Sequence, residues 1–241
     1  MSCVGAIRYM PVKQGTFRGR MQRLFRSFAY FLWKRELKKF ARTNSGRTLS
    51  VTDVGCGPGF LLERLRLWFP KANLTGIDSS QLLLSTMASQ CDGVRALVGD
   101  ACSIPLEDGS QDALFCLHVV EHLPDPSLFF SEARRVLRPG GLLIVATPNL
   151  DGLGARIMKS KWSGYSDPTH ISLHGADFWR EHVLRAGFQI RRDGTTGLSG
   201  LPWLNKMPLG LLQWIPVFLF GMFPWNKGEA YICVAASGQR F

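Results

Sequence analysis

The chain has 241 residues, 46% of them hydrophobic, and a net charge of +11 at pH 7. This length suffices for one domain with a buried core and short appendages. No internal repeat is present, and no Cys-x-x-Cys pair occurs among the six cysteines at positions 3, 56, 91, 102, 116 and 233, which excludes a repeat array and a zinc ribbon. We therefore expect a reduced, cytoplasmic protein without a metal site.

The first segment, residues 1–47, is predicted to be a basic arm that precedes a domain in residues 48–241. Residues 1–50 contain 12 Lys and Arg but a single acid, so they carry the whole net charge. Apolar side chains recur at helical spacing in this arm, at Phe17, Met21, Leu24, Phe25, Phe28 and Leu32. Three interpretations remain open: a helix that caps the substrate cleft, a helix on an anionic membrane surface, and a phosphate grip for nucleic acid. The last is disfavoured because no nucleic-acid-binding module is visible.

A buried strand, a glycine-rich turn and the start of a helix are predicted in the run Val51–Phe60. Its three alternating glycines, Gly55, Gly57 and Gly59, let the backbone turn tightly and leave no side chains above it. The N–H groups at the start of the following helix point at the same place. The turn is therefore suited to holding a polar ligand directly against the backbone.

The rest of the chain alternates between strands and helices. The predicted strands are Asn73–Ile77, Val94–Val98, Asp112–Leu117, Leu142–Ala146, Phe188–Arg192 and Ala230–Ala235, and a helix is predicted near Ala176–Ala186. The second strand of the unit ends in Asp78, where a carboxylate can accept hydrogen bonds from both hydroxyls of a ribose. An acid in Gly99-Asp100-Ala101, directly after the third strand, is placed to contact an adenine.

The order of these motifs resembles the class I S-adenosylmethionine-dependent methyltransferases. The resemblance rests on Asp-x-Gly-x-Gly-x-Gly from Asp53, on Asp78, on Gly-Asp-Ala at 99–101 and on Leu-Arg-Pro-Gly-Gly at 137–141. The third glycine comes one residue earlier than in the dinucleotide fingerprint, which favours this family over a nicotinamide dehydrogenase. The resemblance to this family implies an α/β fold with a seven-stranded, mostly parallel sheet, an antiparallel last strand and helices on both faces.

The same resemblance implies S-adenosylmethionine as cofactor and assigns roles to the residues around the turn. The glycine turn, with Cys56 inside it, would lie under the methionine part, and Asp53 would order the turn or meet the cofactor's ammonium. The other implied cofactor contacts are Asp78 and Ser79 at the ribose, Asp100 and Ala101 at the adenine, and Leu117 and His118 at the far wall.

An acceptor hydroxyl would need a base, and histidine suits neutral pH. His170 lies in the loop Tyr165–His170 after the fifth strand, and His118 directly follows the fourth. Both loops reach the carboxyl edge of the sheet, so we predict His170 as the first candidate base, His118 as the second, and Asp167 as a group that orients His170. A structural hydrogen bond is the alternative role for each histidine.

The apolar segment 194–226 interrupts the domain before its last strand and carries a single charge, Lys206. Its prolines 208, 216 and 224 disfavour a straight membrane-spanning helix. We interpret it as an apolar flap over the substrate site or an element that dips into one membrane leaflet, with ordinary core packing as the alternative. The first two interpretations indicate a hydrophobic or lipid-linked acceptor.

The sequence thus favours O-methylation of a hydrophobic small molecule or lipid-linked precursor. Two alternatives stay open: an RNA methyltransferase that uses the basic arm, and a catalytically silent subunit that binds a partner or a membrane. Leu117-His118-Val119-Val120 lacks the Asn/Asp-Pro-Pro-aromatic motif of many adenine and glutamine methyltransferases. Peripheral association with the inner membrane face and the formation of an oligomer are also left open.

Overall fold

A computed structural model describes residues 33–197, 222 and 226–238 of the chain. The predicted apolar face of the basic arm, residues 17–32, and most of the apolar segment 194–226 lie outside the described residues. Among the described residues, no helix combines the length and apolar composition that crossing a bilayer requires.

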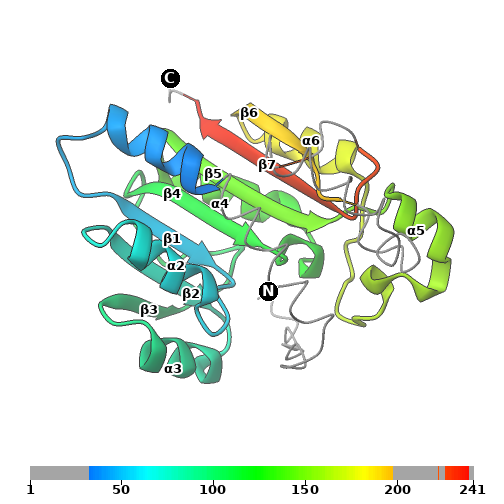
Figure 1. Cartoon of the computed structure of the whole chain (residues 1–241), viewed down its shortest axis with the longest axis horizontal. Coiled ribbons are helices and arrows are strands. Elements are labelled where there is room, and N and C mark those ends of the chain that lie inside the picture. The colour runs from blue at the N-terminus through cyan, green and yellow to red at the C-terminus, as the bar shows by residue number, and fades with distance from the viewer. Residues whose placement is uncertain (1–32, 198–221, 223–225, 239–241) are drawn as a thin grey trace, which may run out of the picture.

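The centre of the fold is a seven-stranded sheet with the order β3-β2-β1-β4-β5-β7-β6 (Figure 1). Its strands are β1 (Ser50–Val54), β2 (Asn73–Asp78), β3 (Val94–Val98), β4 (Gln111–Leu117), β5 (Leu137–Pro148), β6 (Phe188–Thr195) and β7 (Ala230–Ser237). The first five strands pair in parallel, and β7 runs antiparallel to both β5 and β6. The predicted fold class is confirmed.

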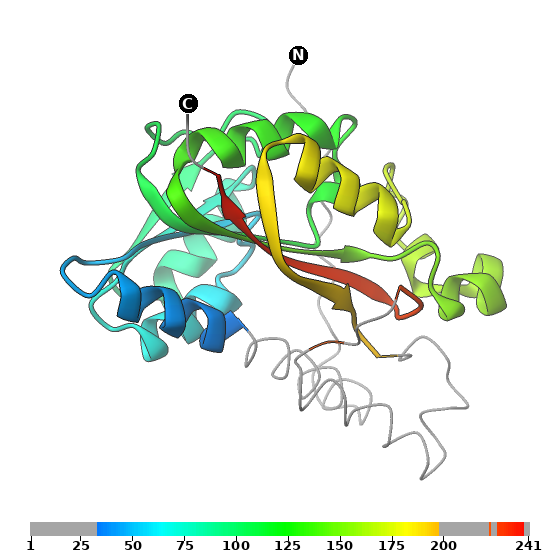
Figure 2. The same cartoon turned by 90° about the horizontal axis from the view of Figure 1, so that it is seen from above.

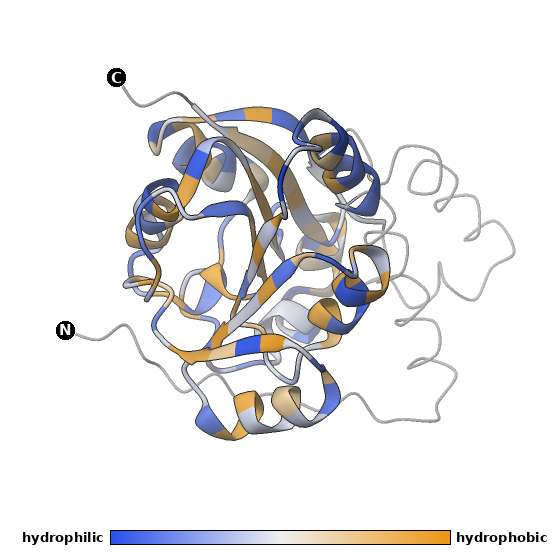
Figure 3. Ribbon diagram, turned by 90° about the vertical axis from the view of Figure 1, so that its left-hand side faces the viewer, coloured by the Kyte–Doolittle hydropathy of each residue, from blue (hydrophilic) through white to orange (hydrophobic). Residues whose placement is uncertain are grey.

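Helices cover both faces of the sheet, which gives three layers (Figure 2). The described helices are a helix over residues 33–43, α2 (Phe60–Trp68), α3 (Gln81–Gln90), α4 (Pro126–Val136), α5 (Leu153–Met158) and α6 (Ala176–Arg185), with short 3-10 turns at Val120–His122, Lys159–Lys161 and Ser163–Tyr165. The helix over 33–43, α2 and α3 lie on one face, and α4 and α6 lie on the other. Hydrophilic and hydrophobic residues alternate along the outer helices, as helices with one buried face require (Figure 3).

Side chains that alternate along the strands separate the core into two halves. Leu142, Ile144 and Ala146 of β5 pack in the half with α2, whereas Leu143 and Val145 pack in the half with α4 and α6. Because successive strand residues point to opposite faces, a strand covered on both sides must be apolar throughout. This explains why the parallel strands read as short continuous apolar runs.

The helix over residues 33–43 belongs to the core, although sequence analysis assigned it to the basic arm. Trp33, Leu37 and Phe40 are buried, and the ring of Trp33 meets that of Phe115 on β4 edge to face at 6.0 Å. Glu36 forms an ion pair with Arg192 of β6, 3.5 Å apart. The buried face of this helix therefore lies against the sheet.

Replacing Leu37 by alanine tests this packing. Leu37 is fully buried, and deleting such a side chain costs about 2–5 kcal/mol in the free energy of unfolding through lost burial and the cavity left behind. The control is Leu67→Ala on α2, where the side chain is 72% exposed and we expect a change of at most about 0.5 kcal/mol. Urea denaturation measures both, and equal midpoints for the two variants would show that the helix does not contribute to the core.

Candidate functional site

The carboxyl ends of β1, β2, β4 and β5 bring the predicted site residues to one edge of the sheet. The strand order reverses at β1, which has β2 on one side and β4 on the other. Open α/β sheets bind ligands in the crevice outside such a switch point. The glycine turn, Asp78 and His118 directly follow or end these strands.

The glycine turn after β1 is fastened to the end of β2. The N–H groups of Gly55 and Cys56 donate to the carbonyl of Ile77 at 2.7 and 3.1 Å, and that of Gly57 donates to Asp78 Oδ2 at 2.9 Å. Gly57 has a positive φ of 52°, and a Cβ built on it would meet no atom within 4 Å. The space above this peptide is therefore open to a ligand.

The flanks of the turn are closed. A Cβ on Gly55 would overlap the side chain of Val119 in the loop after β4, and one on Gly59 would overlap Met87 of α3. The Cys56 side chain is buried, and its Sγ lies 3.9 Å from Met87 Sδ and 3.6 Å from the carbonyl of Gly57. Val119 also brings the loop after β4 into direct contact with the glycine turn.

Two buried acids, Asp53 and Asp78, lie next to the glycine turn. Asp53 is 4% exposed, and burial, followed by the charge of Asp78, raises the pKa of its carboxyl to about 8. Asp78 accepts from Gly57 N and, through Oδ1, from Ser80 N at 2.9 Å. A carboxylate has about four lone pairs, so these two bonds leave acceptor capacity on Asp78. Ser79, half-buried, follows directly.

The turn after β3 is hydrogen-bonded to the end of β2. Gly99 N donates to the carbonyl of Asp78 at 3.1 Å, and Asp100 Oδ1 accepts from Cys102 N at 2.8 Å. Ala101 is buried beneath this turn. The order Gly57, Asp78, Asp100 thus runs along the carboxyl edge from β1 to β3.

S-adenosylmethionine fits this arrangement by its chemistry. It carries an ammonium group, a sulfonium and a ribose with two neighbouring hydroxyls. A buried acid with a raised pKa gains most from a cationic partner. Asp53 is such an acid, and it lies beside the open glycine turn. Asp78 has the remaining acceptor capacity that two hydroxyls need.

His118 begins a second cluster after β4. Its φ of 58° lies in the left-handed region, which is strained for a non-glycine residue. Its N–H donates to Ala146 of β5 at 2.7 Å, and its ring, 55% exposed, places Nδ1 3.3 Å from Glu121 Oε1. The preceding residue, Leu117, is half-buried at the end of β4.

Glu121 lies fully buried behind His118. Thr147 Oγ1 of β5 donates to its Oε2 at 3.0 Å. Burial has the largest single effect and raises the pKa of Glu121, but the contact with His118, the charges of His118 and His122 and a backbone hydrogen bond together lower the pKa overall. The carboxylate is therefore ionised at neutral pH in a buried position.

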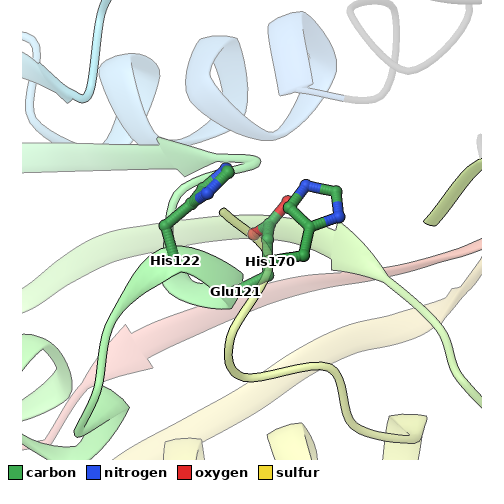
Figure 4. Close-up of side chains that lie close together, drawn as sticks. All are labelled: Glu121, His122 and His170. Carbon is green, nitrogen blue, oxygen red and sulfur yellow. The ribbon is translucent and has the colours of Figure 1, made fainter. Parts of the chain in front are cut away.

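The loop after β5 brings His170 to this cluster (Figure 4). Its ring centroid lies 4.7 Å from that of His122. His170 Nδ1 is 2.6 Å from the carbonyl of Gly164, and His122 Nδ1 is 3.1 Å from the carbonyl of Thr169. Burial lowers the pKa of His122, which favours the neutral ring.

Asp167 is connected to His122 through Thr169. Its Oδ1 accepts from Thr169 N at 2.9 Å and from Thr169 Oγ1 at 2.6 Å, and that hydroxyl lies 2.9 Å from His122 Nδ1. The group that holds His170 is the Gly164 carbonyl. The backbone carbonyl of Asp167 accepts from His170 N at 3.2 Å, and the orientation of the His170 ring by Asp167 stays a prediction.

Sequence analysis did not select Glu121 or His122. The available signal was the pattern His118-x-x-Glu121-His122 directly after a strand that ends at the ligand-binding edge. The burial of the Glu121 side chain was not predictable, because nothing in the pattern shows that Glu121 is buried and faces Thr147.

Comparisons with known proteins agree with this geometry. Residues 52–145 match the model of a family described as a methyltransferase domain. The malonyl-[acyl-carrier protein] O-methyltransferase of Hahella chejuensis is 35% identical over 132 residues, which cover 54% of this chain and 47% of that protein. The ubiquinone biosynthesis O-methyltransferase of Caulobacter sp. is 35% identical over 129 residues, 49% of this chain and 50% of that protein.

The chain spans about half the length of these two relatives. A Haloferax volcanii protein solved in complex with the Trm112 methyltransferase activator has a TM-score of 0.62 at 16% identity, over 95% of this chain and 100% of its own, which shows the shared fold. The sheet order, the glycine turn with its two acids and the matching family model lead to one conclusion. Residues 52–145 belong to the methyltransferase domain family, and the chain is similar to the class I S-adenosylmethionine-dependent methyltransferases.

Proposed function

We propose that this protein transfers a methyl group from S-adenosylmethionine to an oxygen of a small molecule. The observation that carries the proposal is the open peptide at Gly57 flanked by the buried acids Asp53 and Asp78. The two relatives named above are both O-methyltransferases, which supports oxygen as the acceptor atom. The apolar composition of residues 194–226 supports a hydrophobic or lipid-linked acceptor.

When bound, the cofactor supplies an electrophilic methyl group on a positively charged sulfur. Asp53 would hold the ammonium, Asp78 with Ser79 the ribose, and the turn after β3, with Asp100 and Ala101, the adenine. Alignment of donor and acceptor provides much of the acceleration of such a displacement.

The acceptor proton would pass to a histidine at the same edge. His170 offers its Nε2, because its Nδ1 lies against the Gly164 carbonyl and must donate there. His118, whose ring is 55% exposed, is the second candidate. Full turnover in both His118→Ala and His170→Ala, with cofactor binding intact, would exclude this role for the two histidines.

A transfer assay with methyl-labelled S-adenosylmethionine tests the proposed function. Extract of the source cells supplies acceptors and is separated afterwards into lipid, aqueous small-molecule, RNA and protein fractions. We expect label in the lipid or small-molecule fraction, strongly reduced in Asp78→Asn because the amide has one acceptor oxygen where the carboxylate has two, both already used by Gly57 N and Ser80 N. The control Asp177→Asn, an exposed acid at the start of α6, should leave the labelling unchanged.

The other outcomes contradict the proposal in different ways. Label in RNA would assign the protein to RNA methylation. Absence of cofactor binding in calorimetry would support a catalytically silent subunit. Equal labelling by the wild type and Asp78→Asn would remove Asp78 from the cofactor site.

A further inference from the structure

We propose that Glu121, His122 and His170 form a binding site for a divalent transition-metal ion such as Zn²⁺. One ligating atom from each of the three side chains lies within 4.8 Å of the other two. Two imidazoles and one carboxylate are a ligand set that suits zinc and other first-row divalent metals. The three side chains converge from the turn after β4 and from the loop after β5 (Figure 4).

Both imidazoles are oriented as metal-binding histidines are. His122 Nδ1 faces the Thr169 carbonyl at 3.1 Å, and His170 Nδ1 faces the Gly164 carbonyl at 2.6 Å. A carbonyl only accepts, so each Nδ1 carries the proton and each Nε2 keeps its lone pair. A hydrogen bond from the second ring nitrogen to a backbone carbonyl is the outer-shell contact that fixes the tautomer of a metal ligand.

The carboxylate provides the second, independent observation. Glu121 is fully buried, and its Oε1 makes no hydrogen bond of good geometry to the described residues. The ring of His118 contacts this oxygen through Nδ1 at 3.3 Å. Burying a carboxylate oxygen without a partner is costly. A cation between the carboxylate and the two imidazoles would remove that cost.

The groups around the three side chains hold them in place. Thr147 Oγ1 donates to Glu121 Oε2, and Asp167 accepts from Thr169, whose hydroxyl and carbonyl both contact His122. Ligands about 2.1 Å from a tetrahedral zinc lie about 3.4 Å from one another. Binding would therefore draw the three groups together, and His170 can follow because it sits on a loop rather than on a helix or strand.

The positions of the three residues in the sequence do not indicate a metal site. Glu121 and His122 are adjacent, and His170 comes from the far side of α4 and β5. Sequence analysis therefore predicted no metal site. The alternative to metal binding is a hydrogen-bonded cluster of the same three groups without an ion.

The position of the cluster connects the ion to the proposed function. Val119, next to the cluster in sequence, touches the glycine turn, so an ion here would lie beside the expected acceptor. If the proposed function holds, the ion would take the lone pair of His170 Nε2, so the acceptor proton would pass to His118, the second candidate base.

Metal binding can be tested without any transfer assay. Full-length, untagged protein is stripped with a chelator, dialysed and titrated with Co²⁺, whose visible absorption reports its coordination, and then with Zn²⁺ in competition. We expect one equivalent of Co²⁺ to bind and Zn²⁺ to displace it. His170→Gln and Glu121→Gln should each weaken the affinity at least tenfold.

The matched control is His182→Gln on α6. His182 Nδ1 also faces a backbone carbonyl, that of Phe178 at 2.9 Å, but His182 lies outside the cluster, so its replacement should leave the affinity unchanged. Circular dichroism checks that the variants fold, and the half-buried His170 is the safer of the two sites to change. No cobalt uptake by the wild type, or equal affinity in all four proteins, would overturn the metal site. Cobalt binding combined with failed methyl transfer would leave the metal site standing and reject the proposed function.

Discussion

Gly55→Ala is expected to destabilise the protein, whereas Gly57→Ala is expected to remove cofactor binding with little loss of stability. Both glycines have positive φ, 71° and 52°, so alanine is strained at either position. Only at Gly55 would the new Cβ also overlap Val119, while at Gly57 it would enter open space. The free energy of unfolding should fall by about 2–5 kcal/mol in Gly55→Ala and by about 1 kcal/mol in Gly57→Ala.

Urea denaturation and calorimetric titration with S-adenosylmethionine measure the two effects separately. The methyl group at Gly57 would occupy the place proposed for the methionine part of the cofactor, so the affinity should fall although the fold persists. Unchanged affinity in a folded Gly57→Ala variant would show that the cofactor does not lie on this peptide. Similar stability of both variants would contradict the close approach of Val119.

Asp53→Asn is expected to make the cofactor-free protein more stable than the wild type as the pH rises from 4 to 8. The carboxyl has a pKa of about 8 in the fold, against an ordinary value of 3.8, because of burial and, second, the charge of Asp78. Between these values the unfolded chain has released a proton that the folded chain still holds. The free energy of unfolding of the wild type therefore falls with rising pH, by up to about 1.4 kcal/mol per unit, and levels off above 8.

Asparagine cannot ionise, so this slope should be absent in the variant. Urea midpoints at pH 5 and pH 8 measure the difference, and parallel pH profiles for the two proteins would contradict the raised pKa. If Asp53 holds the cofactor's ammonium, cofactor binding at pH 6.5 should release about one proton from the wild type and none from Asp53→Asn. Calorimetry in two buffers of different ionisation enthalpy detects that proton, and buffer-independent heats for the wild type would exclude the pairing.

Local patterns predicted the strands well where each strand is a short apolar run. Val94–Val98 was predicted with the bounds that β3 has in the structure. The prediction was less complete for β5, which begins at Leu137 rather than Leu142. Pro139-Gly140-Gly141 is a typical turn sequence, but Leu137 pairs with Gln111 across an irregularity in the register, and Gly140 takes a φ of 76°. Pairing between strands decides this extent, and a single segment does not show it.

The sequence by itself determined the glycine turn and the separate strands, because these depend on residues close together in the chain: alternating glycines, an acid at a strand end, apolar runs of strand length. The seven-stranded sheet was implied by the resemblance that the motifs carry. The tertiary structure alone decided that the helix over residues 33–43 packs against the sheet. It also brought His170 to Glu121 and His122 and buried the Glu121 carboxylate. Contacts such as that between His122 and Thr169 join residues 47 positions apart, and they form only when β4 and β5 lie side by side and bring their following loops to one edge.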